Sequence, residues 1–483
     1  MNRTVRRTAV LLLLLLLALL VRATWIQGPG AGALADNDHN RRFALRRYAR
    51  PLGDIYAGGQ PLTGSEHTGS GPLAYQRTYA DGPLYAPVTG YDSQLYGSTL
   101  LERLYRGDLD GTDTRMQSPL DVLTKSPGPP GAVMTTIDPA VQRAGFAALS
   151  GASGGAVALD PASGAVLAMV SSPSYDPGLI SGGPGAAAAW KKLSADRGRA
   201  MANLALREPV APGSAFKLVT AAAALEDGLY PSVDTPTRSP LPYTLPGTRT
   251  PLPNEDASAP CRNATLRTAL RYSCNNVFAN VAHDLGQPKM LAMARKFGFD
   301  EPRQDFPVRA ATSVYPTSAM TESSLALTGI GQFDVTATPL QMAMVSAAIV
   351  NDGRLAAPYL VSEVTDHGGR PVLSVPRGGT SQVISPQTAE QLRSAMETVV
   401  GKGSGAAARV PGAEVGGKTG TAQRGVGNSG NPYAWFTAYG RKGDRQVAVA
   451  VWIRDSAAAR SEVSGGRLAA PVAARMMTAA LNH

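Results

Sequence analysis

The stretch GGKTGTA (416–422), followed by AWFTAY (434–439) and QVAVAVWI (446–453), decides the fold predicted for this chain. Each run is short and bounded by glycine-rich or polar turns, which predicts three consecutive antiparallel strands. Upstream, the apolar runs 156–159 and 165–170 flank an Asp-Pro-Ala-Ser-Gly turn and predict a β-hairpin. These five runs come from both ends of one region, so we expect one five-stranded antiparallel sheet.

The region between the two groups of strands is mostly helical by pattern. Residues 215–227 end at a glycine, residues 339–350 end at Asn-Asp-Gly, and 471–481 form a terminal helix. A sheet with helices packed on its faces defines an α+β fold.

The clearest chemical signal is Pro-Gly-Ser-Ala-Phe-Lys at 212–217. The Pro-Gly turn places Ser214 in the first turn of the predicted helix, and residues three apart share a helix face, so Lys217 is expected to reach the Ser214 hydroxyl. A neutral amine beside a serine makes it a nucleophile, which requires that burial and a second cation lower the pKa of Lys217. Alone, an S-x-x-K pattern arises by chance about once in a chain this long.

A second triplet, Ser273-Cys274-Asn275, follows a short helical stretch that ends near Tyr272. The Ser273 hydroxyl is a candidate proton relay. Asn275 is a candidate to hold Lys217 and to bind a substrate amide. The alternative is a capped turn, and another S-x-N at 429–431 shows that the pattern is common.

The third element is the K-T-G triplet inside GGKTGTA. Glycines in a strand, Gly420 among them, allow close approach of a ligand backbone, and an edge strand can pair with a peptide. Lys418 and the hydroxyls of Thr419 and Thr421 are candidates to bind a carboxylate, and the backbone N–H groups of Ser214 and Thr421 are candidates for an oxyanion hole. A lone K-T-G is equally compatible with a surface turn.

Length and composition limit the remaining possibilities. With 483 residues we expect two folded domains, a smaller one with a Pro-rich linker over 27–140 and the α+β domain over 141–483. The net charge is +10, but the basic residues are scattered, so an ordinary solvated surface is the simplest interpretation. A basic exported protein would also be attracted to anionic lipids or wall polymers, and no nucleic-acid partner is expected. None of the five histidines is paired at ligand spacing, so we expect no metal and no cofactor. In an oxidising setting Cys261 and Cys274 predict a disulfide, with two buried thiols as the alternative.

The N-terminus carries an export signal. Arginines precede an apolar run at 9–21, which is short for a span of roughly 20 residues, although Trp25 and Ile26 extend it. The small residues at 31, 33 and 35 that a signal peptidase would use lie far downstream, so a retained anchor over residues 1–26 is favoured over a cleaved signal. The positive-inside rule then predicts a single-pass protein of the cytoplasmic membrane whose folded domains lie outside.

In this order S-x-x-K, S-x-N and K-T-G form the motif set of penicillin-binding proteins and serine β-lactamases. The chain resembles class B penicillin-binding proteins over residues 36–483, and among them most closely the actinobacterial penicillin-binding protein A group. The similar stretches are 96–98, 135–139, 156–177, 330–332, 335–342 and 435–437. It departs from the family pattern at Leu204 in place of Arg, at Leu52 within an Arg-Gly pair, and at Phe333 where Gly is common.

The resemblance implies a serine D,D-transpeptidase with a non-catalytic pedestal domain, acting on peptidoglycan stem peptides that end in D-Ala-D-Ala. Ser214 would attack the penultimate D-Ala carbonyl, Lys217 would take its proton, and D-Ala would leave after protonation through Ser273. A neighbouring amine would resolve the acyl-enzyme into a cross-link, whereas a β-lactam would leave a slowly hydrolysed adduct. The first 140 residues have no room for a glycosyltransferase module, so a separate glycan polymerase of the division or elongation machinery is an expected partner.

Three alternatives share some or all of these motifs. A D,D-carboxypeptidase uses the same fold with water as acceptor. A class A β-lactamase needs a Glu in an E-x-x-L-N setting, and the nearest match, 322–326, has Ala in place of Asn. A non-catalytic β-lactam sensor would need cytoplasmic signalling segments, and only eight residues precede the apolar run. A division scaffold would tolerate loss of Lys217 or Lys418, and both lysines are present.

Overall fold

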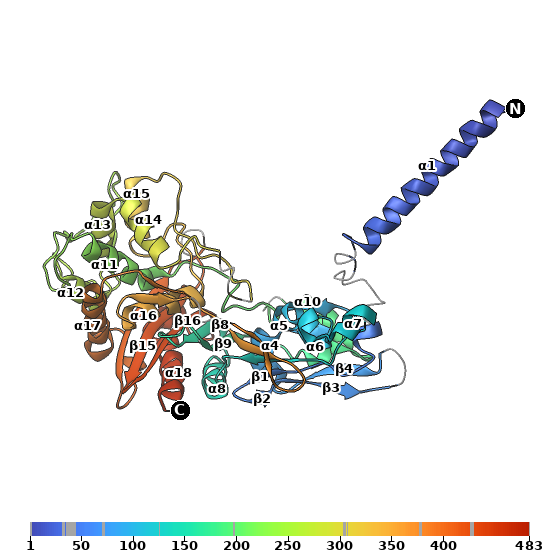
Figure 1. Ribbon diagram of the computed structural model, residues 1–483. Coiled ribbons are helices and arrows are strands. Elements are labelled where there is room, and N and C mark those ends of the chain that lie inside the picture. The colour runs from blue at the N-terminus through green and yellow to red at the C-terminus, as the bar shows by residue number, and fades with distance from the viewer. Residues whose placement is uncertain are drawn as a thin grey trace.

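The computed structural model describes residues 2–30, 34, 45–69, 73–124, 126–196, 199–302, 306, 308–375, 379–425 and 429–482. Its first helix, α1 (Asn2–Gln27), is exposed throughout, and its segment Arg3–Gln27 is long and apolar enough to cross a membrane (Figure 1). The helix continues through Trp25 and Ile26, so the candidate span is longer than the leucine-rich run alone. The small residues at 31, 33 and 35 lie outside the described residues.

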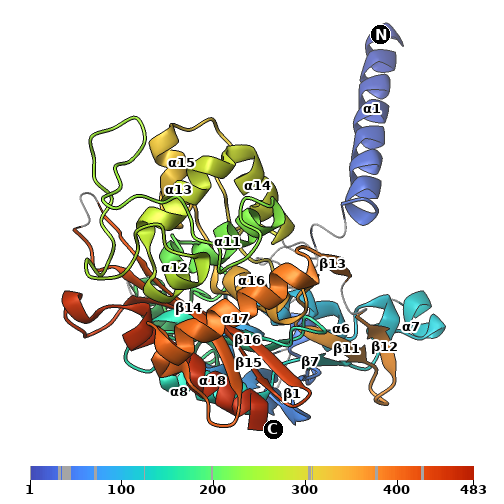
Figure 2. The same ribbon diagram turned by 90° about the vertical axis from the view of Figure 1, so that its left-hand side faces the viewer.

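The main sheet contains the five predicted strands, all antiparallel, in the order β14-β15-β16-β8-β9. Three of them, β14, β15 and β16, can be followed in Figure 2. Their bounds are β14 (Glu414–Ala422), β15 (Tyr433–Lys442), β16 (Arg445–Asp455), β8 (Ser153–Leu159) and β9 (Val166–Ser172). The predicted sheet and its hairpin are therefore confirmed. β14 lies at the edge of this sheet, which leaves its outer side open to another segment.

Helices cover both faces of the main sheet because its inner strands are apolar on both sides. Along β16, Trp452 packs into one core and its neighbour Val451 packs into the other. Helix α16 (Pro339–Val350), buried along its whole length, lies on the first face. Helices α8 (Pro139–Ala148) and α18 (Ala470–Asn482) cover the second face.

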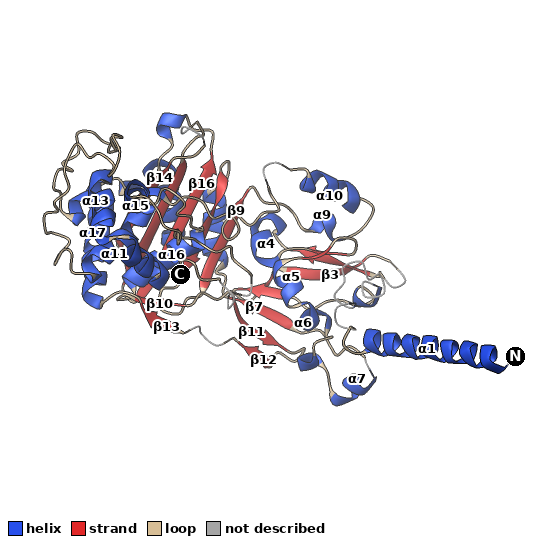
Figure 3. Ribbon diagram, turned by 90° about the horizontal axis from the view of Figure 1, so that it is seen from above, coloured by secondary structure: helices blue, strands red, loops and turns tan. Residues whose placement is uncertain are grey.

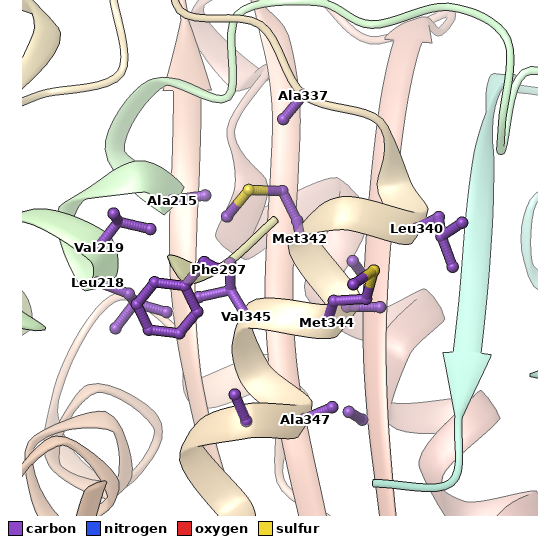
Figure 4. Close-up of a cluster of buried hydrophobic side chains, with 14 of the residues drawn as sticks. Ala215, Leu218, Val219, Phe297, Ala337, Leu340, Met342, Met344, Val345 and Ala347 are labelled. Atoms are coloured by element: carbon purple, nitrogen blue, oxygen red, sulfur yellow. The ribbon is translucent and has the colours of Figure 1, made fainter. Parts of the chain in front are cut away.

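The first core joins the sheet to the helical region of the fold. Figure 4 shows Phe297 between Leu218 of α11 (Lys217–Glu226) and Val345 of α16. The helices predicted at 215–227 and 339–350 are confirmed, except that a 3₁₀ turn, η2 (Gly213–Phe216), precedes α11. The other elements here are α12 (Leu266–Tyr272), α13 (Asn275–Leu285), α14 (Gln287–Lys296), α15 (Glu322–Thr328), α17 (Pro386–Lys402), η3 (Ala406–Ala408), η5 (Arg460–Glu462), the π-helical η6 (Gly465–Ala469) and the strand pair β10 (Arg354–Ala356) and β13 (Thr380–Gln382).

A second sheet, whose strands β7, β11 and β12 can be followed in Figure 3, lies to one side of the main sheet. Its strand order is β12-β11-β7-β1-β2. Its strands are β12 (Pro371–Ser374), β11 (Val361–Thr365), β7 (Ala132–Thr135), β1 (Ile55–Ala57) and β2 (Gln60–Pro61). Because β11 and β12 come from late in the chain, the segment 361–374 returns to pair with the early strands. We call residues 45–135 together with 361–374 the N-terminal unit.

Short elements complete the N-terminal unit and the segment that packs beside it. They are β3 (Thr63–His67), β4 (Tyr75–Tyr79), β5 (Asp92–Ser93), β6 (Gly97–Ser98), α4 (Gly82–Thr89), α5 (Leu100–Leu104), α6 (Arg106–Asp110), η1 (Thr114–Met116), α7 (Pro119–Thr124), α9 (Gly178–Ser181) and α10 (Ala186–Ser194). Part of the predicted linker is thus helical. Ser118 and Asp121 bond reciprocally across the first turn of α7, which caps the helix.

Paired charges are buried inside the N-terminal unit. The Arg47 guanidinium lies 2.9 Å from Asp92 and 2.8 Å from Asp110. Arg77 Nε donates to Glu102 at 2.7 Å, and both of these side chains are fully buried. Burial lowers the pKa of Arg77, but the charge and hydrogen bond of Glu102, together with Tyr79 and Asp54, outweigh that effect and leave the pKa raised. These cations therefore stay charged, and each is matched by a carboxylate.

Candidate active site

Ser214 lies in η2, directly before α11, at a point where the edge of the main sheet comes close. Gly213 has a φ of +53°, and a Cβ there would lie 2.8 Å from the carbonyl oxygen of Thr421. Glycine is therefore required both for the backbone conformation and for the contact. Ser214 as a whole residue is 8% exposed, so it is buried but not sealed off from the surface.

Lys217 is fully buried one turn after Ser214. Its Nζ donates to the carbonyl oxygen of Ser273 at 2.7 Å, to Ser273 Oγ at 3.3 Å and to Asn275 Oδ1 at 2.8 Å. Within the described chain no hydrogen bond joins Lys217 to the Ser214 hydroxyl, although the two share the same end of the helix. Burial, and then the charge of Lys418, place the pKa of Lys217 well below its usual value.

Ser273 connects the two lysines. It ends α12 with a left-handed φ of 58°, a conformation that turns the chain sharply into α13. Its Oγ accepts from Lys418 Nζ at 3.0 Å and lies 3.3 Å from Lys217 Nζ. The S-x-N triplet is therefore the junction of two helices, and its hydroxyl can pass a proton between the two amines.

Lys418 extends from β14 and is fully buried. Besides Ser273, its Nζ donates to the Thr419 carbonyl at 2.9 Å. Burial lowers the pKa of Lys418 to about 7, an effect that Glu255 partly opposes. Among the described residues neither Lys217 nor Lys418 forms an ion pair with a carboxylate, and their hydrogen-bond partners are hydroxyl, carbonyl and amide oxygens.

The K-T-G residues form the open edge of β14. Thr419 shares a hydrogen bond of 2.8 Å with the Ser404 hydroxyl, and a Cβ on Gly420 would lie 2.7 Å from the Pro212 carbonyl. The Thr421 carbonyl faces Gly213, and because the N–H and C=O of one strand residue point to the same side, the Thr421 N–H faces η2 as well. The structure thus brings all eight predicted catalytic and substrate-binding residues together at η2, the α12–α13 junction and β14.

Cys261 and Cys274 are joined in the structure by a disulfide, with sulfur atoms 2.00 Å apart and Cα atoms 5.6 Å apart. The bridge ties the loop that precedes α12 to the S-x-N triplet. Among the described residues, no group of three or more His, Cys, Asp or Glu side chains is arranged to hold a metal ion.

Two residues of that loop, Asn254 and Glu255, also lie at the site, although nothing in the sequence singles them out. Asn254 Oδ1 accepts from the backbone N–H of Asn275 at 2.6 Å, and Glu255 Oε1 accepts from the Thr421 hydroxyl at 3.3 Å. Neither residue belongs to a spaced motif. Only the folding of the loop onto the S-x-N segment reveals them.

Comparison with known proteins agrees with this geometry. Residues 154–478 match the family model of the penicillin binding protein transpeptidase domain, and residues 52–131 match that of the penicillin binding protein A dimerisation domain. The chain belongs to the penicillin-binding protein family.

The peptidoglycan D,D-transpeptidase PbpA of Mycolicibacterium smegmatis is 38% identical over 100% of this penicillin-binding protein and 100% of the relative. PbpA of Mycobacterium tuberculosis is 36% identical over 100% of this chain and 99% of its own. The solved structure of penicillin-binding protein A from M. tuberculosis as a ceftriaxone acyl-enzyme complex superposes with a TM-score of 0.82, 36% identity and coverage of 90% of this chain and 100% of that one.

The structure gives a physical reason for the glycine that is common in the family at position 333. Phe333, at the position where Gly is common, has a left-handed φ of 52°. A side chain is strained in that conformation, and glycine is not. The neighbouring Gly331 supports the site, because its carbonyl accepts from the Gly213 N–H at 3.0 Å.

Proposed function

We propose that this penicillin-binding protein is a serine D,D-transpeptidase that cross-links peptidoglycan stem peptides through an acyl-enzyme on Ser214, and that β-lactams acylate the same serine. The observation that carries the proposal is the convergence of Ser214, two buried lysines and Ser273 at the open edge of β14. The family and the named activity of full-length relatives support it.

In the first step, neutral Lys217 acts as the base. A neutral amine has two N–H groups, which the Ser273 carbonyl and Asn275 Oδ1 accept, so its lone pair is free to take the Ser214 proton. The Ser214 oxygen then bonds to the penultimate D-Ala carbonyl carbon. As the C–N bond breaks, the departing D-Ala amine receives a proton through Ser273, which lies between the two amines.

The edge of β14 positions the donor peptide for this step. Charged Lys418, with Thr419, binds the terminal carboxylate, and the donor backbone pairs with β14 by strand addition. The N–H groups of Ser214 and Thr421 stabilise the negative charge that develops on the scissile carbonyl oxygen. An amine of a second stem peptide then attacks the ester, which releases Ser214 and forms the cross-link.

The same machinery would serve a D,D-carboxypeptidase if water replaced the acceptor amine. The two activities differ in the second step only. A role as a non-catalytic sensor or division scaffold is less well supported, because a scaffold has no need for two buried, unpaired lysines with lowered pKa values.

We further propose that α1 stays uncleaved as a single cytoplasmic-membrane anchor, with residues 27–140 and 141–483 outside the cell as pedestal and transpeptidase domains. The long apolar α1 and the match of the early region to a dimerisation domain support this arrangement. A separate glycan polymerase then supplies the glycan strands that this protein cross-links.

The test is acylation of the full-length protein in detergent with benzylpenicillin, followed by digestion and mass spectrometry. We expect an adduct on the peptide that contains Ser214 which lasts many minutes, and none in a Ser214→Ala variant. Stem peptides with and without an acceptor amine then separate transpeptidation from carboxypeptidation. Rapid loss of the adduct with drug turnover would indicate a β-lactamase, and no adduct would contradict the proposed function.

A further inference from the structure

The loop before α12 holds an acidic side chain at the mouth of the site. Asn254 Oδ1 accepts from the backbone N–H groups of Asn275 at 2.6 Å and Asn276 at 3.2 Å, and Asn254 Nδ2 donates to Asn276 Oδ1 at 3.1 Å. The Pro253 carbonyl accepts from Asn275 Nδ2 at 2.8 Å. These bonds fix the backbone next to Glu255 relative to the catalytic S-x-N segment.

Glu255 is exposed, and its Oε1 accepts from the Thr421 hydroxyl at 3.3 Å. Its charge acts on both buried lysines, raising the pKa of Lys217 and of Lys418 against the effect of burial. Within the described part of the chain, no Arg or Lys forms an ion pair with Glu255. Its carboxylate is therefore available to a cation that arrives with the substrate.

We propose that Glu255 is a specificity-determining residue that selects donor substrates carrying a cationic amine on the acyl side of the scissile bond. The inference rests on the proposed function. With the donor carboxylate at Lys418 and Thr419 and the scissile carbonyl at Thr421, the preceding donor residues continue past Thr421, where Glu255 lies. The Glu255 carboxylate attracts an ammonium group at this point and repels a carboxylate, and it has no net electrostatic effect on a neutral group.

Three penicillins that differ at one side-chain carbon test this directly. Ampicillin carries an ammonium group, benzylpenicillin carries no charge and carbenicillin carries a carboxylate at that carbon. We expect Glu255→Gln in the full-length protein to slow acylation by ampicillin about threefold and to speed acylation by carbenicillin about threefold, each relative to benzylpenicillin. Normalising to benzylpenicillin removes any effect of the substitution on the lysines, which is common to all three drugs.

The neighbouring carboxylate supplies a charge-matched control. Asp256 accepts from the Ser258 backbone and hydroxyl rather than from Thr421, so Asp256→Asn is expected to leave the normalised rates unchanged. Glu255→Asp keeps the charge and should keep the preference of the wild type. High salt should reduce that preference, because the group is exposed.

The outcomes are distinguishable. Equal normalised rates in wild type and Glu255→Gln, with Ser214 still acylated, overturn the role of Glu255 and leave the proposed function standing. An equal change in Asp256→Asn also overturns it, because the effect is then one of net charge. Failure of all three drugs to acylate wild-type Ser214 overturns the proposed function and this inference with it.

Discussion

Buried cations occur in two regions of this protein, and their pKa values are shifted in opposite directions. In the N-terminal unit, Arg47 and Arg77 lie against carboxylates, which hold the pKa of each above its usual value. In the active site, Lys217 and Lys418 are equally buried but face hydroxyl, carbonyl and amide oxygens, and the pKa of each is lowered. Burial by itself lowers the pKa of all four cations. The opposite outcomes arise because the two arginines have carboxylate partners and the two lysines have neutral oxygen partners.

The difference separates structural charges from reactive ones. A buried cation with a carboxylate is neutralised in place and has no reason to release its proton. A buried cation with neutral partners releases a proton easily and can still attract an anion that arrives later. The predictions below alter one side of this comparison at a time.

The largest expected effect is on catalysis, from Lys217→Met. We expect benzylpenicillin acylation to slow by about 10²–10⁴-fold, because the base is lost. Stability should stay equal or rise, because an unpaired buried amine has been replaced by a similar apolar side chain. Stopped-flow labelling and thermal melting measure the two quantities, with the exposed Lys192→Met as control. A large loss of stability would show that Lys217 is structural.

Arg77→Met should lower stability and leave the acylation rate unchanged. It leaves Glu102 buried without its partner, and we expect the free energy of unfolding to fall by about 3–5 kcal/mol. The rate of Ser214 labelling in the folded protein should not change. Adding Glu102→Leu should recover much of the stability. If the double variant melts no higher than the single one, the paired charge is not the cause.

Replacing both Cys261 and Cys274 by Ser should lower the free energy of unfolding by about 2–4 kcal/mol, since the bridge closes a loop of 13 residues. Acylation should slow as well, because Ser273 and Asn275 flank the bridged Cys274. Reduction of the wild-type protein followed by melting and labelling provides a second measurement. Unchanged values in both would contradict a structural role of the bridge at the site.

The smallest expected effect is on the pH dependence of acylation. With its pKa at about 7, Lys418 loses its charge above neutrality and no longer attracts the drug carboxylate. We expect the acylation rate to fall about fivefold between pH 7 and pH 8, as the protonated fraction falls. An acylation rate that stays constant from pH 7 to pH 9 would contradict the role of the Lys418 charge in attracting the drug.

Stability should show the opposite trend over the same range. The pKa of Lys418 is about 7 in the folded protein and 10.5 for an unperturbed lysine, so the unfolded chain binds more protons between these values. The free energy of unfolding therefore rises with pH across that window, and Lys418→Met should reduce the slope. Arg77 keeps its proton throughout, so Arg77→Met should leave the slope unchanged.

Much of the fold was predictable from the chain alone. Short apolar runs bounded by glycine-rich or polar turns predict β8, β9, β14, β15 and β16, because strands buried on two faces are apolar along most of their length. The 3₁₀ turn at η2 was harder to predict from the sequence, because a Pro-Gly turn and the start of an α-helix have the same sequence signature. The return of 361–374 to the N-terminal sheet was not foreseen, because strand pairing between segments far apart in the chain leaves no local signal.

By itself, the sequence determined which groups are the candidates for the chemistry: the serine, the two lysines and the hydroxyls of three spaced motifs, which are the residue types that acyl transfer requires. Only the tertiary structure decided how they act together. It buries Lys217 and Lys418 around Ser273 without a carboxylate, and it folds the loop with Asn254 and Glu255 onto the site. Burial and charge depend on what lies nearby in space, and side chains 56 and 145 residues apart become neighbours only when the chain folds.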